Sequence, residues 1–313
     1  METEKVPIVD FFGHDGVMKS LGTIGAEIYS AFKSAGFVYL KNHGIAAPKI
    51  EAAFNVSREF FQLPVIVKQK YARPTDSNEG WVAVERESLN PERPADLKEA
   101  FNFSKKENVK NCLPKEVTTF NPVLADLFDE AQQLTFRVLE ALDEGMPGNV
   151  NVKVKIDNIF TNSHKLIGKP GNATGLRSLY YPALDPEGSI KPGQVRCGEH
   201  SDYGSITILF QDDIGGLEVQ RVDGMYVPAP PIPGTVLVNV GDLMQRWTAD
   251  QIKSTKHRVL IPEKELLMRQ VRQSIAFFVQ PDDNFLITCL DGSNKYEPVS
   301  SLDYLNMRFA ATY

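Results

Sequence analysis

The second half of this chain is a series of short segments with the composition of β-strands. From Thr174 onward, runs rich in β-branched and aromatic residues are separated by glycine and proline. Several short strands with turn signals between them are typical of an all-β sandwich or barrel, so they predict a jelly-roll core. The predicted strands span 175–181, 205–210, 216–221, 235–240, 256–260 and 272–279.

The first half of the chain shows helical periodicity instead. Apolar residues that recur every three or four positions predict helices at 21–32, 48–61 and 121–145, and β-rich runs predict strands at 6–12 and 37–40. Asn121 would cap the longest helix, with Pro122 at its first position. We expect this helix to end at Gly145 and to pack against the outside of the barrel.

Together these patterns predict an α+β protein with a double-stranded β-helix (jelly-roll) core, an N-terminal helical region and flanking helices. At 313 residues and 42% hydrophobic content, the chain can bury a substantial core, and no linker divides it cleanly. The predicted segments are an N-terminal region at 1–115, backbone helices at 116–173, the catalytic core at 174–285 and a C-terminal helix at 286–313.

Two further segments bear on the site. Residues 76–99 are polar and interrupted by two prolines, which predicts a long loop that could border the active site. Trp81 is the one large apolar residue of this loop, and we expect it to pin the loop by packing, although substrate contact is the alternative. The tail at 302–309 predicts a helix that either covers the barrel mouth or packs on its flank.

Bulk charge and cysteine content narrow the class of protein. The net charge is −6 and the pI is near 5.5, which argues against a nucleic-acid partner. Three widely spaced cysteines do not form a disulfide framework, and we interpret Cys197 as a buried packing thiol. The N-terminus has no signal-peptide pattern and no run of about 18 apolar residues occurs, so we expect a cytoplasmic protein without a membrane partner. The oligomeric state is not indicated.

Three side chains form a candidate metal site. His200 and Asp202 stand two positions apart, so on an extended strand they share one face. His257 stands 55 positions after Asp202 in another predicted strand. His-x-Asp alone is a common surface sequence, but two imidazoles and one carboxylate form the facial triad of non-haem Fe(II) oxygenases, which leaves positions open for substrate and O₂.

A possible anion-binding pair follows on the last long strand. Arg272 and Ser274 share a strand face, fifteen and seventeen residues after His257. A guanidinium fork beside a hydroxyl is well suited to bind a carboxylate. The spacing therefore suggests a single pocket for the metal and a carboxylate ligand.

These residues resemble a known family. His200-x-Asp202, His257 and Arg272-x-Ser274 look like the 2-oxoglutarate- and Fe(II)-dependent dioxygenases of the isopenicillin N synthase-like group. The likeness covers nearly the whole chain, and within the group it is greatest to the fungal thymine 7-hydroxylase type. The other stretches that carry the resemblance are 36–45, Tyr181-Pro182, 215–217 and 239–242.

The resemblance implies how a co-substrate is held. Tyr181 matches the tyrosine that hydrogen-bonds the far carboxylate of 2-oxoglutarate, so Tyr181, Arg272 and Ser274 would form its binding site. The chain departs from many plant members at Leu179, where they carry asparagine. Tyr180 should point to the opposite face of the strand and serve in packing.

The resemblance also implies candidates for the organic substrate: Arg177, Tyr203 and Phe278. Both rings could stack on a flat or apolar molecule, or they could be ordinary barrel aromatics. Arg177 could bind a substrate carbonyl or carboxylate, or pair with a structural acid. Asp242 is expected to be a helix N-cap, with a hydrogen bond to a ligand histidine as the alternative. His14, His43 and His164 are expected to be structural.

The predicted activity is that of an Fe(II)/2-oxoglutarate-dependent dioxygenase that oxidises a small molecule, most simply by hydroxylation, with release of succinate and CO₂. The same site could instead perform oxidative cyclisation or desaturation. A protein of another class, a metal-binding jelly roll that acts as a sensor or scaffold, is the second alternative; the presence of Tyr181, Arg272 and Ser274 counts against it.

Overall fold

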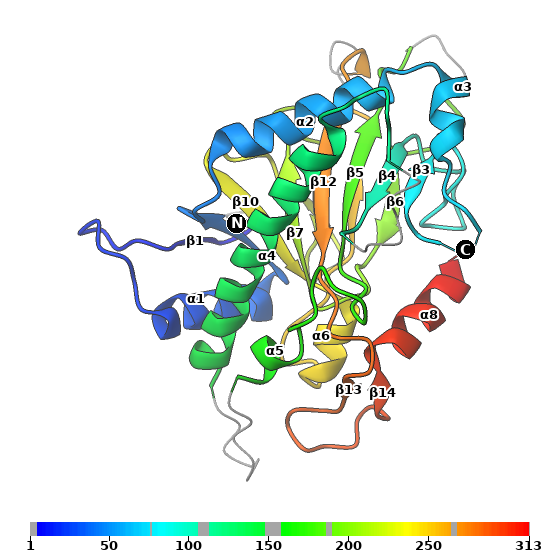
Figure 1. The fold of residues 1–313 in the computed structure, drawn as a ribbon. Helices are drawn as coiled ribbons and strands as arrows, with labels where there is room; N and C mark the ends of the chain where they lie inside the picture. The colour runs from blue at the N-terminus through cyan, green and yellow to red at the C-terminus, as the bar shows by residue number, and fades with distance from the viewer. Residues whose placement is uncertain are drawn as a thin grey trace.

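The computed structural model describes residues 5–75, 77–105, 113–147, 158–185, 190–263 and 268–312. Its core is a large sheet facing a small one (Figure 1). The large sheet has the strand order β1-β2-β10-β7-β12-β5-β4-β3, and the small sheet has the order β6-β11-β8-β9. The large-sheet strands are β1 (Ile8–Asp10), β2 (Phe37–Lys41), β3 (Gly80–Val82), β4 (Glu99–Phe103), β5 (Gly175–Tyr181), β7 (Ile206–Gln211), β10 (Thr235–Val240) and β12 (Arg272–Phe278). The small-sheet strands are β6 (Cys197–His200), β8 (Leu217–Gln220), β9 (Tyr226–Pro228) and β11 (His257–Val259).

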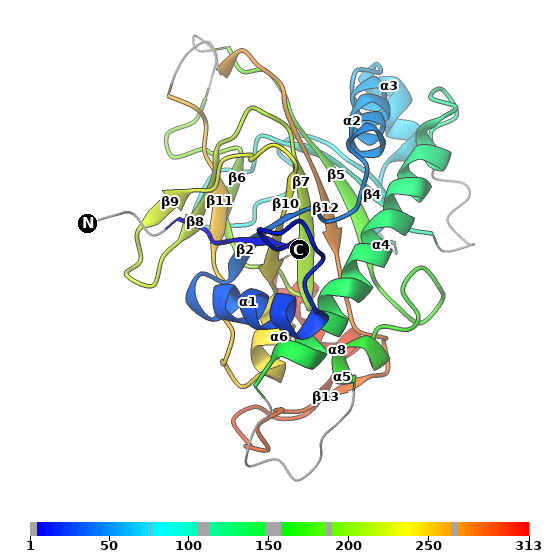
Figure 2. The same cartoon turned by 90° about the vertical axis from the view of Figure 1, so that its left-hand side faces the viewer.

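Helices cover the face of the large sheet that points away from the small sheet. Figure 2 shows α2 and α4 on one side of the large sheet and β6, β8, β9 and β11 on the other. A short two-stranded sheet lies near the C-terminus. The remaining elements are α1 (Leu21–Ser34), α2 (Ala47–Phe61), α3 (Val65–Lys68), a 3₁₀ turn (Gln69–Tyr71), α4 (Phe120–Gly145), α5 (Ile159–Asn162), α6 (Asp242–Trp247), β13 (Leu286–Ile287), β14 (Val299–Ser300) and α8 (Ser301–Thr312).

The large sheet is buried on both faces, which explains the nearly continuous apolar runs of its strands. In β2, Val38 and Leu40 belong to the core beneath the helices, whereas Phe37 and Tyr39 belong to a second core between the two sheets. Successive side chains of a strand point to opposite faces, so one strand contributes to both cores. The jelly-roll prediction is confirmed.

The long helix α4 packs on the outside of the barrel, as expected. Helix α1 crosses it closely at Gly25, where an added Cβ would overlap the main chain of Ala141, so only glycine fits there. The predicted start of α4 was wrong by two residues, because Thr119 is the N-cap and the helix begins at Phe120. Pro122 is tolerated in the first turn, since the N–H groups there lack partners within the helix.

The prediction of a loop throughout 76–99 was also wrong in part. Gly80–Val82 forms β3, which pairs with β4, and β4 begins at Glu99. Trp81 is buried in β3 and donates a hydrogen bond from Nε1 to Oε2 of Glu99 over 2.7 Å, so its predicted packing role is confirmed. A three-residue strand is too short for its alternation to be read from sequence.

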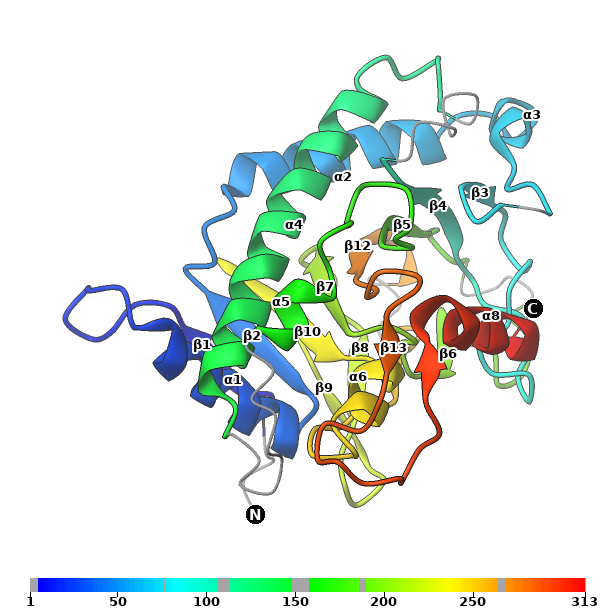
Figure 3. The ribbon, with the colours of Figure 1, turned by 60° about the horizontal axis from the view of Figure 1, so that its bottom comes forward.

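The C-terminal helix α8 lies on the opposite side of the molecule from α1 in both Figure 1 and Figure 3. Of the two alternatives for the predicted tail helix, the structure supports a cover for the barrel, because Leu305 and Phe309 line the internal cavity. Among the described residues, no helix is both long enough and apolar enough to span a membrane.

Candidate active site

One cavity of about 240 Å³ lies between the two sheets. Its wall includes inward-facing side chains of β5, β12, β6 and β11, and two residues of α8. All nine residues that the sequence singled out as site candidates line it: Arg177, Tyr181, His200, Asp202, Tyr203, His257, Arg272, Ser274 and Phe278.

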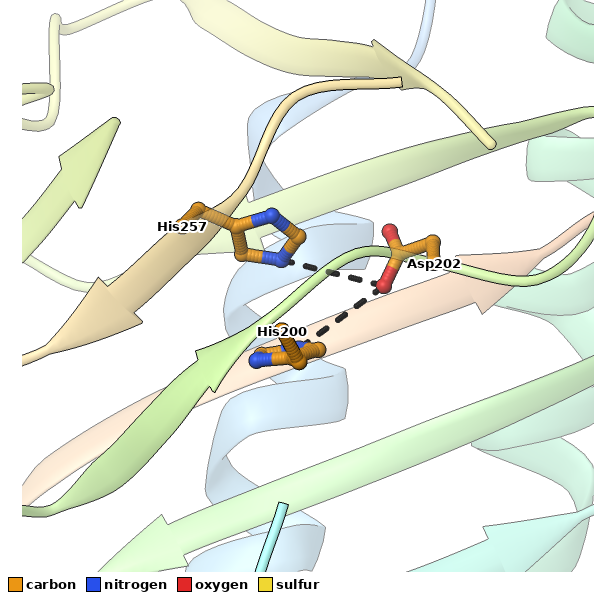
Figure 4. Close-up of side chains that lie close together, drawn as sticks. All are labelled: His200, Asp202 and His257. Atoms are coloured by element: carbon orange, nitrogen blue, oxygen red, sulfur yellow. Dashed lines mark ion pairs between the residues drawn. The ribbon is translucent and has the colours of Figure 1, made fainter. Parts of the chain in front are cut away.

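The three candidate metal ligands converge on one point of this cavity (Figure 4). His200 and His257 are opposite each other in the β6–β11 pairing, with ring centroids 4.3 Å apart. The Nε2 atoms of His200 and His257 lie 3.8 and 3.7 Å from Oδ1 of Asp202. Strand β6 ends at His200, so Asp202 lies two residues beyond the strand rather than on it, yet its carboxylate still faces both rings.

Backbone contacts set the orientation of both imidazoles. Nδ1 of His200 lies 2.8 Å from the carbonyl oxygen of Gly198, and Nδ1 of His257 lies 3.2 Å from that of Thr255. In each ring Nδ1 therefore carries the proton and donates it, which leaves the lone pair of Nε2 directed at Asp202. Burial, followed by the nearby His200, lowers the pKa of His257 to about 4, so this ring is neutral at physiological pH.

Asn239 on β10 fixes the carboxylate. Its Nδ2 donates to Oδ2 of Asp202 over 2.7 Å, and both side chains are buried. Burial raises the pKa of Asp202, but the two histidines and this amide outweigh burial, so the net pKa lies below the usual value. No role was predicted for Asn239. The available signals were its place on a predicted strand and in the 239–242 stretch that carries the family resemblance.

The carboxylate-binding residues lie at one end of the cavity. Arg272 and Tyr181 are opposite each other in the β12–β5 pairing, and the guanidinium lies 4.7 Å from the centroid of the tyrosine ring. Arg272 donates to the carbonyl of Gly215 over 2.6 Å and to Oγ of Ser274 over 3.3 Å. Arg272 is almost completely buried, yet no carboxylate of the described residues lies within ion-pair distance of it.

A second buried arginine adds positive charge near this end. Arg196 is fully buried, and burial together with the positive charge of Arg272 lowers its pKa to about 10. It donates to the carbonyl of Gln270 over 3.0 Å, two residues before Arg272. Nε and Nη1 of Arg196 have no hydrogen-bond partner in the part of the chain that the structure describes. This end of the cavity is therefore strongly electropositive and suited to an anion.

The three substrate candidates line the cavity but differ in their contacts. Arg177 forms an ion pair with Glu87. Pairing with an acid of the protein was one of the two alternatives predicted for Arg177. The ring of Tyr203 contacts Phe309 of α8 at 6.1 Å between centroids, and Arg308 lies 4.4 Å above it. Phe278 is half-buried on β12. The structure therefore brings the three to one cavity without deciding their roles.

Asp242 has a different role from the one expected. Gly241 is the N-cap of α6, and Asp242 is the first residue of the helix. Its carboxylate accepts a hydrogen bond from Oγ of Ser201 over 3.0 Å and forms an ion pair with Arg308. No hydrogen bond links Asp242 to His200 or His257, both of which are described. It instead connects the segment between two candidate ligands to α8.

Tyr180 and two of the three histidines expected to be structural are buried away from the cavity. Tyr180 stacks on Phe61 with ring centroids 5.1 Å apart, on the face away from the cavity. His164 is fully buried and its Nε2 lies 2.6 Å from Oγ of Ser205. His43 is also buried. Cys197 is buried as predicted, and burial raises the pKa of its thiol to about 12. His14 is exposed, and it lies outside the cluster of candidate ligands.

Comparisons with known proteins match most of this chain to two family models. Residues 172–281 match the model of the 2OG-Fe(II) oxygenase superfamily, and residues 6–122 match the model described as non-haem dioxygenase in morphine synthesis, N-terminal. The chain is 31% identical to the 2-oxoglutarate-Fe(II) type oxidoreductase ppzD of Metarhizium rileyi, over 92% of this chain and 85% of that protein. It is 30% identical to the proline hydroxylase buaE of Petromyces alliaceus over the full length of both.

Solved structures show the same relationship. The complex of full-length Neurospora crassa thymine 7-hydroxylase with α-KG, which is 2-oxoglutarate, superposes with a TM-score of 0.84 at 35% identity, and the match covers 97% of this chain and 96% of that one. A complex of the same enzyme with α-KG and thymine gives a TM-score of 0.83 at 34% identity, covering 98% and 97% of the two chains. With the sequence match, the fold and the His-Asp-His cluster in agreement, this chain belongs to the 2OG-Fe(II) oxygenase superfamily and is a 2-oxoglutarate-dependent dioxygenase.

Proposed function

We propose that the enzyme hydroxylates a small organic molecule at an Fe(II) ion bound by His200, Asp202 and His257. The observation that carries this proposal is that these ligand atoms all lie within 4.8 Å of one another in a cavity whose other end holds an unpaired, buried arginine. Two imidazole nitrogens and one carboxylate oxygen fit Fe(II) and leave coordination positions open. Asn239 and the backbone carbonyls that orient the imidazoles would support the ligand set.

2-Oxoglutarate would bind with its distal carboxylate between Arg272, Ser274 and Tyr181. The guanidinium supplies charge and a planar fork, and the two hydroxyls supply further donors. Burial keeps water from competing for the carboxylate, so the charge interaction is strengthened. Arg196 does not line the cavity, so it would not contact 2-oxoglutarate directly. It would favour binding of the carboxylate only through its positive charge.

Bound Fe(II) supplies the activation of O₂, in a reaction that converts substrate, O₂ and 2-oxoglutarate into hydroxylated product, succinate and CO₂. The chain itself must place a substrate C–H bond beside the metal and exclude water. We propose Arg177, Tyr203 and Phe278 as the residues that bind the substrate. The thymine complex of the related Neurospora crassa enzyme supports a compact, planar molecule, and the net charge of −6 supports a substrate other than nucleic acid.

The proposal is tested in two stages. Anaerobic addition of Fe(II) and 2-oxoglutarate should produce the visible charge-transfer band of the metal-bound keto acid, and absence of the band would contradict the metal site. A panel of small molecules is then screened for succinate release in air, with product analysis by mass spectrometry. Hydroxylation adds one oxygen atom to the substrate. A product that has only lost two hydrogen atoms would show cyclisation or desaturation instead.

A further inference from the structure

Strand β12 and the two residues that follow it carry one continuous row of side chains along the cavity. Arg272, Ser274, Ala276, Phe278 and Gln280 alternate along the chain, and all five line the cavity. Arg272 and Ser274 form the electropositive end, so Gln280 marks the opposite end of the row. On the proposed function, that opposite end is where the organic substrate lies.

The position of Gln280 is set by its surroundings. Its backbone N–H donates to Oγ1 of Thr174 over 3.0 Å, and its carbonyl accepts from Nδ2 of Asn172 over 2.9 Å. The side chain lies against Gly204, where an added Cβ would come within 2.7 Å of Nε2 and 2.9 Å of Cδ. Gly204 follows Tyr203 directly, so the absence of a side chain at Gly204 makes room for the Gln280 carboxamide next to this segment.

Within the described ranges of the chain, the carboxamide of Gln280 has no hydrogen-bond partner. The residue is only 5% exposed, and Oε1 is buried without a hydrogen bond. None of the hydrogen bonds among the described residues involves Nε2 of Gln280 either. A buried polar group left unpaired costs about 1–3 kcal/mol, so such groups are rare unless a ligand or water completes them.

We infer that Gln280 recognises a cis-amide group of the substrate, that is, an N–H directly beside a C=O, as in a lactam, an imide or a pyrimidine base. A carboxamide presents a donor and an acceptor side by side in one plane, so such a group satisfies both through two parallel hydrogen bonds. The terminal torsion of glutamine is soft, so the side chain can turn either edge toward the cavity. This inference rests on the proposed function and names the substrate class.

The test compares matched compounds that do and do not carry the N–H. Thymine, uracil and 2-piperidone are cis-amides, and cyclohexanone has the ring of 2-piperidone without the nitrogen. Binding is measured by the change that each compound causes in the charge-transfer band of the anaerobic Fe(II)–2-oxoglutarate enzyme. We expect at least one cis-amide to bind at millimolar concentration, and 2-piperidone to bind more tightly than cyclohexanone.

The variant Gln280→Leu keeps the approximate size of the side chain and removes both polar atoms. It should weaken binding of the cis-amide by about tenfold to a hundredfold, the loss expected for one or two hydrogen bonds. Affinity for 2-oxoglutarate should not change, because Gln280 is far along the strand from Arg272. Gln220→Leu, at a partly exposed glutamine on β8 whose Nε2 donates to Gly224, is the matched control and should bind normally.

Two results would overturn the inference: no cis-amide compound binds to the wild-type complex, or Gln280→Leu binds cis-amides as well as wild type does. Gln280→Glu provides a second variant in case the leucine variant fails to fold, since it keeps the shape and loses the donor. An intact charge-transfer band in wild type shows that the proposed metal and 2-oxoglutarate sites stand whichever way the substrate test ends.

Discussion

The variant Arg272→Leu should greatly weaken binding of 2-oxoglutarate without removing the metal site. The guanidinium is 1% exposed, has no carboxylate partner among the described residues and lies beside the ring of Tyr181. A bound carboxylate would therefore be its only ionic partner. Removing one member of a buried charge pair costs about 2–5 kcal/mol, which raises Kd about 30-fold to several thousand-fold.

The same numbers predict a thermal-shift result. In the anaerobic Mn(II)-loaded wild type, 2-oxoglutarate at about 100 times its Kd adds about 2.7 kcal/mol to the free energy of unfolding. If Kd rises 30-fold, the same concentration adds only about 0.9 kcal/mol to the variant. The ligand-induced rise in Tm should thus fall to a third or less of the wild-type rise, and direct calorimetric titration should give the matching increase in Kd.

The variant Arg272→Lys tests whether 2-oxoglutarate binding depends on the positive charge of Arg272 alone or also on the planar shape of its guanidinium. An ammonium keeps the positive charge but not the planar fork, so it should recover only part of the affinity. Without 2-oxoglutarate, Arg272→Leu should unfold near the wild-type temperature, because it removes an unpaired buried charge at the expense of three hydrogen bonds. A ligand-induced Tm rise equal to that of wild type would refute the carboxylate site and reopen the case for chemistry without 2-oxoglutarate.

Three further outcomes are expected. Alanine at any one of the three proposed metal ligands should abolish Fe(II)-dependent turnover and leave the fold largely intact; a ligand variant that keeps wild-type iron affinity in a metal titration would contradict the triad. Tyr203→Ala or Phe278→Ala should reduce product formation more than it weakens 2-oxoglutarate binding, so succinate should form in excess of product; equal loss of both would assign the rings to the core. Arg308→Met should loosen α8 from Asp242 and Tyr203, raising KM for the organic substrate while Kd for 2-oxoglutarate stays constant, and an unchanged KM would exclude this positioning role.

Much of the fold was predictable because burial imposes a clear pattern on long elements. Strands β5 and β10 have the predicted bounds, and the amphipathic stripe of α4 was recognised along nearly its whole length. Strands β3, β4, β9, β13 and β14 were not predicted, and β6 was expected only as an extended segment at His200 and Asp202. Four of the missed strands have only two or three residues, and β4 lies at the end of a charged segment whose acid, Glu99, is buried by pairing with Lys68.

The site was predictable where its chemistry requires particular residue types at strand spacing, as with the two histidines, Asp202 and Arg272. Asn239 was missed because its role depends on the distance between β10 and the segment after β6, which sequence spacing does not contain. Glu87 was missed for a similar reason, since its pairing with Arg177 joins positions 90 residues apart. Such contacts depend on strand order, and only the folded chain reveals that order.

Alternate residues of strand β12 serve two different purposes: one set packs in the core beneath the helices, and the other set lines the cavity. Its outward residues Ile275, Phe277 and Val279 belong to the core beneath the helices, and Phe277 meets Phe128 of α4 with ring centroids 4.9 Å apart. Its inward residues line the cavity between the sheets, where Ala276 and Phe278 also contact the second core. Substitutions at Ala276, Phe278 or Gln280 can therefore change the substrate that the cavity admits without disturbing the packing of the helices on the large sheet. A library restricted to these inward positions should yield mostly folded variants.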